Sequence, residues 1–205
     1  MTDLLIVGGG AAGMMAASAA AACGKRVLLL ERNARLGRKL LITGKGRCNV
    51  TNNCDLDTLL ANIPRNPRFL YSAFHRFAPA DTIAFFESRG LALKTERGNR
   101  VFPVSDRAVD VANVLERELK NPLITLRTGR AVQLLTEEGR AAGIRCEDGT
   151  EYQAKAVLLA TGGKSYPLTG STGDGYRLAE EAGHTIVPLA PPLIPVVTEE
   201  DEPKD

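Results

Sequence analysis

The stretch Leu4-Leu5-Ile6-Val7-Gly8-Gly9-Gly10-Ala11-Ala12-Gly13 decides how this chain begins to fold. Its apolar residues predict a buried strand, and its glycines predict a tight turn that opens a helix. Gly8, Gly10 and Gly13 have the G-x-G-x-x-G spacing of a dinucleotide-binding turn. In such a turn the first glycine permits the bend, the second lets a pyrophosphate approach the backbone, and the third lets helix and strand pack closely. The amides at the helix start then face the phosphates.

The residues after this turn complete a βαβ pattern. Ala11–Cys23 is alanine-rich and predicts a helix that Gly24 ends, and Val27–Leu30 predicts a second buried strand. Glu31 follows 23 positions after Gly8, near the roughly 20 expected for an acid that hydrogen-bonds a ribose diol. The alternative is an ordinary βαβ unit with a chance glycine turn. The shared register of glycines, helix and acid favours a nucleotide site, and the carboxylate makes NADP a poor candidate for it.

Composition limits the function classes. The chain has 205 residues, of which 44% are hydrophobic and 24% charged, with a net charge of +2. This is the composition of a globular protein of one domain, or one and a part, and it gives no reason to expect a nucleic-acid partner. No apolar run is long enough to span a bilayer. The N-terminus enters a strand without a signal-peptide pattern, so we expect a cytoplasmic protein.

The cysteines and histidines indicate no metal site. The four cysteines are Cys23, Cys48, Cys54 and Cys146. No pair has C-x-x-C spacing, so neither a zinc site nor a redox dithiol is predicted. Cys23 and Cys146 lie in apolar patterns and are expected to be buried. His75 and His184 lack obvious partners and are expected to be structural.

A basic, glycine-punctuated loop follows Glu31. From Gly37 to Asn49 there are no acidic residues, and the basic ones are Arg38, Lys39, Lys45 and Arg47. The glycines expected to break a regular helix there are Gly37, Gly44 and Gly46. Such a loop beside a pyrophosphate site suits an extended anionic cofactor, because its charges and amides neutralise phosphate and meet polar ring edges. The alternative is a solvated basic loop.

The run from Gly37 through Gly44-Lys45-Gly46-Arg47-Cys48-Asn49-Val50-Thr51-Asn52, after the opening glycine turn and Glu31-Arg32, resembles the YhiN/HI0933-like family of bacterial FAD-dependent flavoproteins. The resemblance implies a glutathione-reductase-type FAD domain and FAD as the tightly held nucleotide. Some members are described as aminoacetone oxidases or as reductases of bile-acid intermediates. Members are longer than this chain, so the resemblance covers their N-terminal portion. It implies that an inserted, largely β domain and a closing FAD-domain segment lie beyond it.

The resemblance also implies roles for single residues. Glu31 would hold the adenosine ribose, Arg38 and Lys39 would lie near the phosphates or the first βαβ turn, and Gly44–Asn49 would run past the flavin ring. Cys48 would then lie close to the isoalloxazine. A redox thiol is one interpretation of Cys48, and a small residue that fits a tight loop is the other, favoured because no partner cysteine has suitable spacing.

The region over residues 55–122 predicts a helical excursion. Pro64–Gly90 has a helical pattern whose aromatic residues are expected to be core. Leu91–Val104 predicts a hairpin that turns at Arg97–Arg100. Ser105 or Asp106 is expected to cap a helix that continues to about Lys120.

Strands dominate the next part of the chain. Leu123–Leu126 predicts a strand, and the segments predicted to form a β-meander are Ala131–Leu135, Ala142–Cys146 and Tyr152–Leu159. Such an inserted meander is typical of two-dinucleotide flavoprotein domains. Ala131 and Val132 match the position where the strand edge of that fold meets the adenine.

A second cofactor signature is Ala156–Gly163. A buried strand ends in Thr161-Gly162-Gly163, which lets the backbone pass close to a cofactor at the carboxyl edge of the sheet. Ser165–Gly175 predicts a loop that leads into a helix ending near Glu181. We expect an FAD-binding domain over residues 1–190, and a proline-rich strap with an acidic tail over 191–205.

The expected fold is therefore α/β, a glutathione-reductase-type (Rossmann-like) FAD-binding domain with a parallel sheet, helices on both faces and an inserted β-meander. The candidate cofactor-binding residues are Gly8, Gly10, Ala12, Gly13, Glu31, Arg32, Arg38, Lys39, Gly44, Gly46, Arg47, Cys48, Asn49, Ala131, Val132, Thr161, Gly162 and Gly163. The sequence identifies no catalytic acid or base and no oligomeric state.

The expected function is an FAD-dependent oxidoreductase, or its FAD-binding portion, that transfers a hydride between a small organic substrate and FAD. NAD(P)H or oxygen would be the second partner. One alternative is a non-catalytic flavin- or nucleotide-binding fragment or partner module. An NAD-linked dehydrogenase is a further alternative, which the basic loop and the Thr-Gly-Gly strand disfavour.

Overall fold

The computed structural model describes residues 1–190. Its centre is a four-stranded parallel sheet with the strand order β10-β1-β2-β6. The strands are β1 (Leu4–Val7), β2 (Val27–Glu31), β6 (Ile124–Thr128) and β10 (Val157–Leu159). β1 pairs with both β2 and β10, so the opening strand lies inside the sheet and is almost completely buried. The expected parallel sheet is confirmed.

Helices cover one face of this sheet. They are α1 (Ala11–Ala22) and α6 (Ala108–Glu118). Ile6 and Leu29 point to this face and share one buried cluster with Met14 of α1 and with Val111 and Leu115 of α6. The alanine-rich sequence of α1 has small side chains, which lets it pack close to the strands. This cluster connects the opening βαβ unit to the excursion that follows it.

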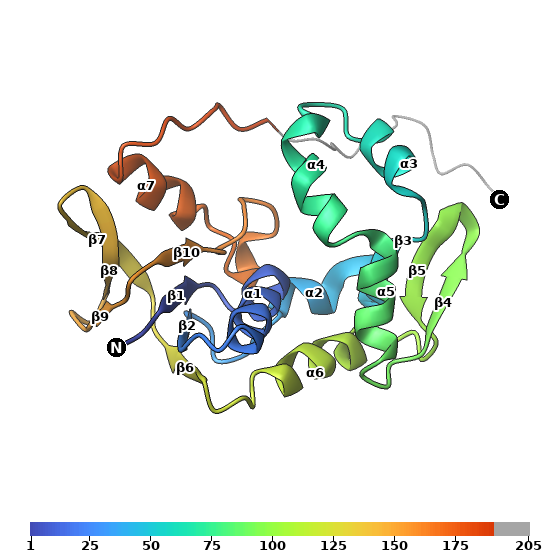
Figure 1. The fold of residues 1–205 in the computed structure, drawn as a ribbon, viewed down its shortest axis with the longest axis horizontal. Helices are drawn as coiled ribbons and strands as arrows, with labels where there is room; N and C mark the ends of the chain where they lie inside the picture. The colour runs from blue at the N-terminus through green and yellow to red at the C-terminus, as the bar shows by residue number, and fades with distance from the viewer. Residues whose placement is uncertain (191–205) are drawn as a thin grey trace, which may run out of the picture.

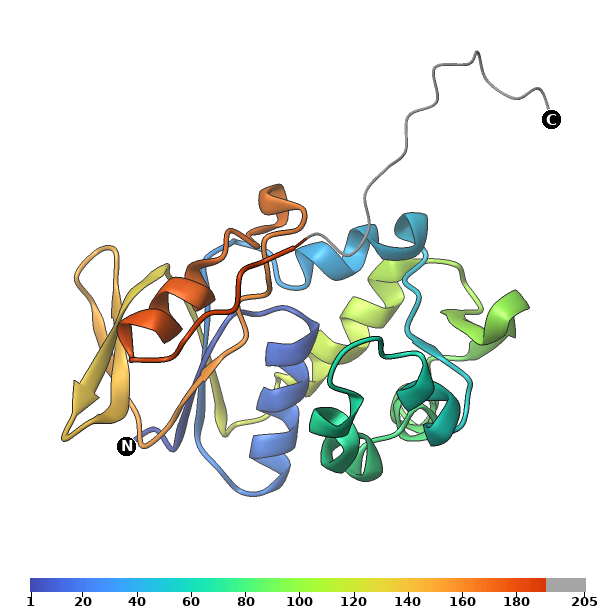
Figure 2. The ribbon, with the colours of Figure 1, turned by 90° about the horizontal axis from the view of Figure 1, so that it is seen from above.

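A β-meander and one helix cover the other face. A three-stranded antiparallel meander lies there, formed by β7 (Ala131–Glu137), β8 (Arg140–Cys146) and β9 (Glu151–Gln153). Leu178 of helix α7 (Asp174–Glu181) joins the buried cluster between the two sheets. The expected meander and the expected helices on both faces are confirmed. Alternating apolar residues of β8 give the meander an apolar face that packs on the sheet. Figure 2 shows the parallel strands between the meander and α1.

The predicted continuous strand Tyr152–Leu159 is in fact two elements. β9 ends at Gln153 and pairs with β8, whereas β10 begins at Val157 and pairs with β1. Ala154 between them is buried and forms a bridge to Thr2. One apolar run therefore leaves the meander and enters the parallel sheet, a change of partner that its composition does not reveal.

The chain between β2 and α6 forms helices and a small sheet, and most of these lie at the opposite end of the molecule from the meander (Figure 1). Cys48, Phe86 and Leu91 of this region pack in the same buried cluster as Ile6 and Met14. The helices of this region are α2 (Arg38–Ile42), the 3-10 helix η1 (Thr43–Gly46), α3 (Leu56–Ala61), α4 (Pro67–Arg76) and α5 (Pro79–Glu87). A small antiparallel sheet, ordered β3-β5-β4, contains β3 (Thr51–Asn52), β4 (Leu93–Glu96) and β5 (Arg100–Pro103). The predicted hairpin is confirmed, with the 3-10 turn η2 (Arg97–Asn99) between β4 and β5.

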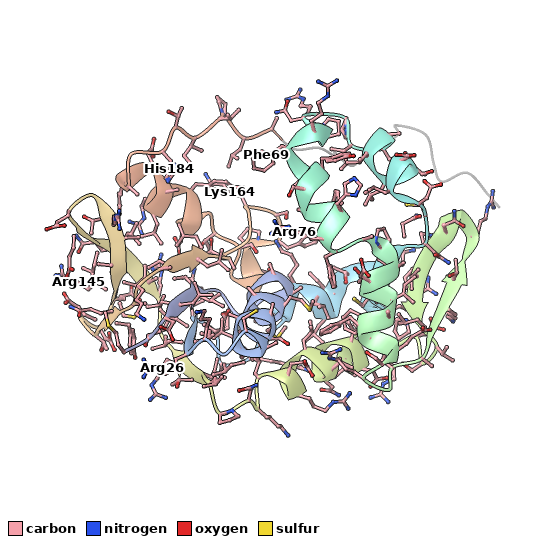
Figure 3. The ribbon with its side chains drawn as sticks, viewed as in Figure 1. Arg26, Phe69, Arg76, Arg145, Lys164 and His184 are labelled. Atoms are coloured by element: carbon pink, nitrogen blue, oxygen red, sulfur yellow. The ribbon has the colours of Figure 1, made fainter. Side chains whose placement is uncertain are left out.

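Several local predictions fail at the surface of this region. Phe69 of α4 is 86% exposed, and Phe77 is exposed as well, whereas Phe86 of α5 is buried. Figure 3 shows Phe69 projecting from α4. Helical spacing predicted these aromatics as core, but no residue of α4 is buried. Spacing identifies the apolar face of a helix and not what lies opposite it.

Two further predictions need correction. Cys23 is exposed, because it follows the last residue of α1 and points beyond the packed part of the helix, whereas Cys146 is buried as expected. Neither Ser105 nor Asp106 caps α6, which begins at Ala108 after Arg107. The Asp106 carboxylate instead accepts a 2.6 Å hydrogen bond from Lys94.

The predicted strap and tail over 191–205 lie outside the described residues. Across residues 1–190, no helix combines the length and the apolar character needed to cross a membrane.

Candidate functional site

A cavity of about 430 Å³ lies at the carboxyl ends of β1, β2 and β10. This volume falls within the roughly 300–1,000 Å³ of small-molecule and cofactor sites. The predicted site residues that line it are Gly8, Gly10, Ala12, Glu31, Arg32, Arg38, Lys39, Asn49, Ala131, Thr161 and Gly162. Those that do not line it are Gly13, Gly44, Gly46, Arg47, Cys48, Val132 and Gly163. The first set comes from four separate parts of the chain that the fold brings to one sheet edge.

The three glycines of the opening turn differ in their surroundings. Gly8 has a φ of +112°, and a Cβ there would lie 2.4 Å from the Ala160 carbonyl oxygen, so the turn must approach β10 closely. A Cβ on Gly13 would lie 1.8 Å from the Gly8 carbonyl oxygen. A Cβ on Gly10 would have no heavy atom of residues 1–190 within 4 Å, apart from those of Gly10 itself and of the two residues next to it in the chain. Gly8 and Gly13 are thus required by packing, whereas Gly10 faces open space.

The start of helix α1 faces this open space. Its N-cap is Gly10, no side chain within residues 1–190 caps it, and its first turn contains no acidic residue. Ala11 and Ala12 of that turn line the cavity. The first amides of a helix lack intrahelical partners and carry the positive end of the helix dipole. The cavity therefore contains a ready site for an anionic group.

Glu31 is fixed at the end of β2 by hydrogen bonds on both carboxylate oxygens. Oε2 accepts a 2.7 Å bond from the backbone amide of Gly9, which ties the glycine turn to this strand end. Oε1 accepts bonds from the backbone amide of Asn33 at 2.8 Å and from its Nδ2 at 2.6 Å. The side chain is buried but lines the cavity. Oε1 already accepts two hydrogen bonds, whereas Oε2 accepts one and has a second lone pair for a ligand hydroxyl.

Two basic side chains of α2 also line the cavity. Arg38 donates a 2.8 Å hydrogen bond to Oδ1 of Asn33, so Asn33 connects Glu31 to this guanidinium. Lys39 donates a 3.3 Å bond to the Ser165 hydroxyl, on the loop after β10. The sequence expects no regular helix here. The structure instead contains a short helix, the five residues of α2. It lies between Gly37 and Gly44, which both have left-handed φ values.

The loop Thr43–Asn49 is held in shape from behind the cavity. Lys45 and Cys48 adopt left-handed φ values of 57° and 62°, which are uncommon for residues other than glycine. Arg47 anchors the loop to the β4–β5 hairpin, with its NH1 3.0 Å from Glu96 Oε1 and 3.3 Å from Asp106 Oδ1. Its guanidinium carbon lies 4.0 Å from the centre of the buried Phe102 ring. We call these four side chains the Arg47 clamp.

Within the Gly44–Asn49 run, Asn49 lines the cavity and the other five residues do not. Cys48 is buried in the helical core cluster. Burial raises the pKa of the Cys48 thiol, and a hydrogen bond with Thr43 only partly offsets this. A protonated, buried thiol is a poor nucleophile. The geometry favours the packing interpretation of Cys48 over the redox interpretation.

The Arg47 clamp predicts a specific response to acid. The hydrogen bond from Lys94 lowers the pKa of Asp106, with a further contribution from Arg47. A carboxyl whose folded-state pKa is lowered contributes stability above its unfolded pKa, about 3.9, and loses it as the pH falls through its folded-state value. Thermal unfolding followed by circular dichroism is therefore expected to give a lower unfolding temperature below about pH 4. In Asp106→Asn this acid-induced decrease should be smaller, and the unfolding temperature at pH 7 lower than that of the wild type.

Glu180→Gln is the matched control, because Glu180 is exposed and has no ion pair among residues 1–190. Its acid response should follow the wild type. Parallel acid responses of Asp106→Asn and the wild type would contradict this account of the clamp.

The second predicted signature packs beside the glycine turn. Ala160, Thr161 and Gly162 line the cavity, and Gly162 has a φ of +75°. A Cβ on Gly162 would lie 2.8 Å from the Ser171 hydroxyl, so the loop before α7 closes over this strand end. The loop Ser165–Gly175 contributes Thr169, Gly170, Ser171 and Asp174 to the cavity.

Some lining residues are absent from the sequence-based set. They include Asn33, Arg35, Leu40, Thr43, Val50, Gly129, Arg130 and Asp174. Two of them could have been suggested by their neighbours in the sequence: Asn33 directly follows Arg32, and Arg130 directly precedes Ala131. His75 and His184 do not line the cavity, and the His75 ring lies 4.2 Å from that of Tyr71. The cavity can hold an elongated anionic ligand. Its lining offers the Glu31 carboxylate, the free amides at the start of α1 and the basic groups of Arg38 and Lys39.

Known proteins resemble this chain in sequence and in fold. The family model for the HI0933-like protein Rossmann domain matches residues 2–192. A 3-dehydro-bile acid delta(4,6)-reductase of Clostridium scindens is 39% identical over 169 residues, which are 82% of this chain and 40% of that protein. A ribosomal RNA dihydrouridine synthase of Escherichia coli is 32% identical over 193 residues, 94% of this chain and 47% of that protein.

Among solved structures, the open conformation of a flavocytochrome c3 fumarate reductase aligns with a TM-score of 0.65 at 23% identity. The alignment covers 88% of this chain and 40% of that one. At this identity the likeness concerns the fold. The chain spans less than half the length of the two curated relatives described above. With the family model matched from residue 2 to residue 192, this chain belongs to the HI0933-like family and contains its Rossmann domain.

Proposed function

We propose that this chain is the FAD-binding portion of a flavin-dependent oxidoreductase. The observation that carries the proposal is the single cavity that joins Glu31, the uncapped start of α1 and the basic residues of α2. A ribose diol, a pyrophosphate and a second polar ring system occur in this order along a dinucleotide. Membership of the HI0933-like family supports the same reading.

The residues present fit FAD. Glu31 would accept hydrogen bonds from the adenosine ribose, and the amides at the start of α1 would bind the pyrophosphate above Gly10. The open space at Gly10, where even a Cβ meets no atom of residues 1–190, is the room that a phosphate needs. Ala131 would border the adenine. Arg38, Lys39 and Asn49 would lie toward the flavin.

When bound, FAD supplies hydride transfer, and the protein binds it, orients it and controls access to it. The substrate of the whole protein is proposed to be a small organic molecule, with NAD(P)H or oxygen as the second redox partner. The relative named as a reductase of a 3-dehydro-bile acid supports this substrate class. None of the cavity residues is assigned as an acid or base. The Arg47 clamp would keep Asn49 at a fixed position beside the ring.

A second candidate substrate is a nucleoside within RNA. Two relatives named ribosomal RNA dihydrouridine synthase favour it, and so does the surface of α4. Arg65 and Arg68 are exposed beside the exposed rings of Phe69 and Tyr71. Arginines bind phosphates and exposed aromatic rings stack on bases, which is how single strands are held. This candidate replaces the substrate class and keeps the cofactor.

The test begins with the visible absorption spectrum of the purified chain, alone and after addition of FAD. We expect a flavin spectrum, and release of FAD on denaturation, identified by mass. A chain that binds AMP or NAD in a thermal-shift assay but not FAD would contradict the proposal in favour of an NAD-linked protein. Anaerobic addition of NADH or NADPH then separates an enzyme from a carrier, because only a redox-competent protein bleaches the bound flavin. The reduced flavin is then offered either an unsaturated 3-oxo steroid acid, whose conjugated double bond can accept the hydride, or a uridine-containing RNA, whose uracil C5–C6 double bond can accept it. Which of the two reoxidises the flavin separates the two substrates.

A further inference from the structure

Two arginines at the Glu31 side of the cavity share one carboxylate. Arg32 NH1 lies 3.0 Å from Asp174 Oδ2. Arg130 approaches the same carboxylate with Nε at 3.4 Å from Oδ2 and NH2 at 3.5 Å from Oδ1. All three side chains line the cavity, and Arg32 directly follows Glu31, the last residue of β2. The three residues lie just after β2, just before β7 and at the start of α7, so the tertiary fold alone brings them together.

The positions of these arginines have a chemical meaning. In dinucleotide folds an acid at the end of the second strand binds the free ribose 2′-hydroxyl, and a nearby arginine accommodates a 2′-phosphate instead. This chain has both groups in sequence, Glu31 and then Arg32. Which of the two nucleotide types the cavity accepts therefore depends on whether the guanidinium groups are free to bind a phosphate.

In the structure these guanidinium groups are already bonded to protein side chains. Besides Asp174, Arg32 NH1 donates a 2.9 Å hydrogen bond to the Thr172 hydroxyl. Arg130 NH1 lies 3.2 Å from Glu147 Oε1, on the outer side of the meander. The Asp174 side chain is only 18% exposed. Burial raises its pKa, but the hydrogen bond from Arg130 and the charges of Arg130 and Arg32 lower it overall, so Asp174 is ionised at neutral pH.

The local charge follows from these pairs. The two arginines face two carboxylates, Asp174 and Glu147, and Glu31 adds a third negative charge without a cationic partner in its hydrogen bonds. A dianionic 2′-phosphate beside Glu31 would meet the guanidinium groups of Arg32 and Arg130 with their positive charges already compensated. A neutral 2′-hydroxyl meets no such penalty and gains a hydrogen bond to Glu31.

We propose that Asp174 is a specificity-determining residue of the nucleotide site, which makes the cavity accept adenosine with a free 2′-hydroxyl and reject adenosine with a 2′-phosphate. It acts by pairing Arg32 and Arg130. The inference rests on the proposed nucleotide function and adds the selection between the two nucleotide classes. It assigns a task to a residue 143 positions after Glu31 in the sequence.

The test compares two probes that differ in one group, 5′-AMP and adenosine 2′,5′-bisphosphate, by isothermal titration of the folded chain. The wild type should bind AMP at least about tenfold more tightly. In Asp174→Asn the affinity for the bisphosphate should rise by about tenfold while that for AMP changes little, because two guanidinium groups become available. Adding Arg32→Gln to Asp174→Asn should remove most of the gain. Glu180→Gln, on the exposed face of the same helix, is the matched control.

A second variant keeps the inference testable if Asp174→Asn folds poorly. Glu147 is exposed, so Glu147→Gln should fold. It should give a smaller gain for the bisphosphate, because it removes only one of the two carboxylates that pair with Arg130. Unchanged discrimination in the folded variants overturns the inference. A wild-type chain that binds neither AMP nor FAD overturns the proposed function itself, so the two failures are distinguishable.

Discussion

Replacing Gly13 with alanine is expected to lower the free energy of unfolding by about 3 kcal/mol or more, enough to leave much of the domain unfolded. The added Cβ would lie 1.8 Å from the carbonyl oxygen of Gly8 and 3.0 Å from its carbonyl carbon. It would also meet Ile6 Cγ2 at 3.4 Å. Two of these atoms belong to the backbone of the turn, so a change of rotamer cannot relieve the clash. The helix would have to move away from the strand that forms the centre of the sheet.

Urea unfolding followed by circular dichroism measures this effect, with the free energy taken from linear extrapolation. Gly163→Ala is the matched control. A Cβ there meets the Tyr176 hydroxyl at 3.3 Å, the far end of a side chain that can shift. We expect Gly163→Ala to cost less than about 1 kcal/mol. Similar unfolding midpoints for Gly13→Ala and the wild type would show that helix and strand do not need this close approach.

The opening βαβ unit could be predicted because its signals are local. Four apolar residues, three spaced glycines and an alanine-rich helix each act within a few positions, and β1, α1 and β2 form nearly as expected. The surface of the excursion could not be predicted in this way. Phe69 and Cys23 are apolar residues in apolar patterns, yet both are exposed, because their burial depends on which elements pack against them.

In the candidate site, too, the residues with local sequence signals could be predicted and their distant partners could not. The glycine turn and Glu31 were identifiable because a strand end and a helix start define one edge of a parallel sheet. The partners of these residues were not. Asp174 pairs with Arg32 across 142 positions. Arg47 pairs with Glu96 at the end of β4 and with Asp106 in the turn before α6, and does not line the cavity. The sequence predicted contact with the cofactor for Arg38, Lys39 and Arg47 of the basic loop. Ion pairs within the protein use part of the charge of this loop, and sequence does not show which part.

Replacing Gly10 with alanine should have the opposite profile to Gly13→Ala, with an intact fold and weakened binding of FAD. Gly10 has φ −79° and ψ −174°, which any residue adopts, and a Cβ there meets no atom of residues 1–190 within 4 Å. The unfolding free energy should therefore change by less than about 1 kcal/mol, mainly because alanine is a poorer N-cap than glycine. The new methyl group would occupy the space above the helix start that we assign to the pyrophosphate.

We expect the dissociation constant for FAD to rise by at least about tenfold, equivalent to about 1.4 kcal/mol, because the phosphates would be pushed away from the amides of α1. Titration with FAD of the chain from which bound flavin has first been removed, followed by flavin fluorescence, measures it. Ala19→Ser is the control, since it also adds one heavy atom to α1 but on an exposed position away from the cavity. Equal affinities of Gly10→Ala and the wild type would mean that the pyrophosphate does not lie over Gly10. Because Gly13→Ala should fail by unfolding and Gly10→Ala by weaker binding alone, the pair separates the glycine that the fold requires from the glycine that the ligand requires.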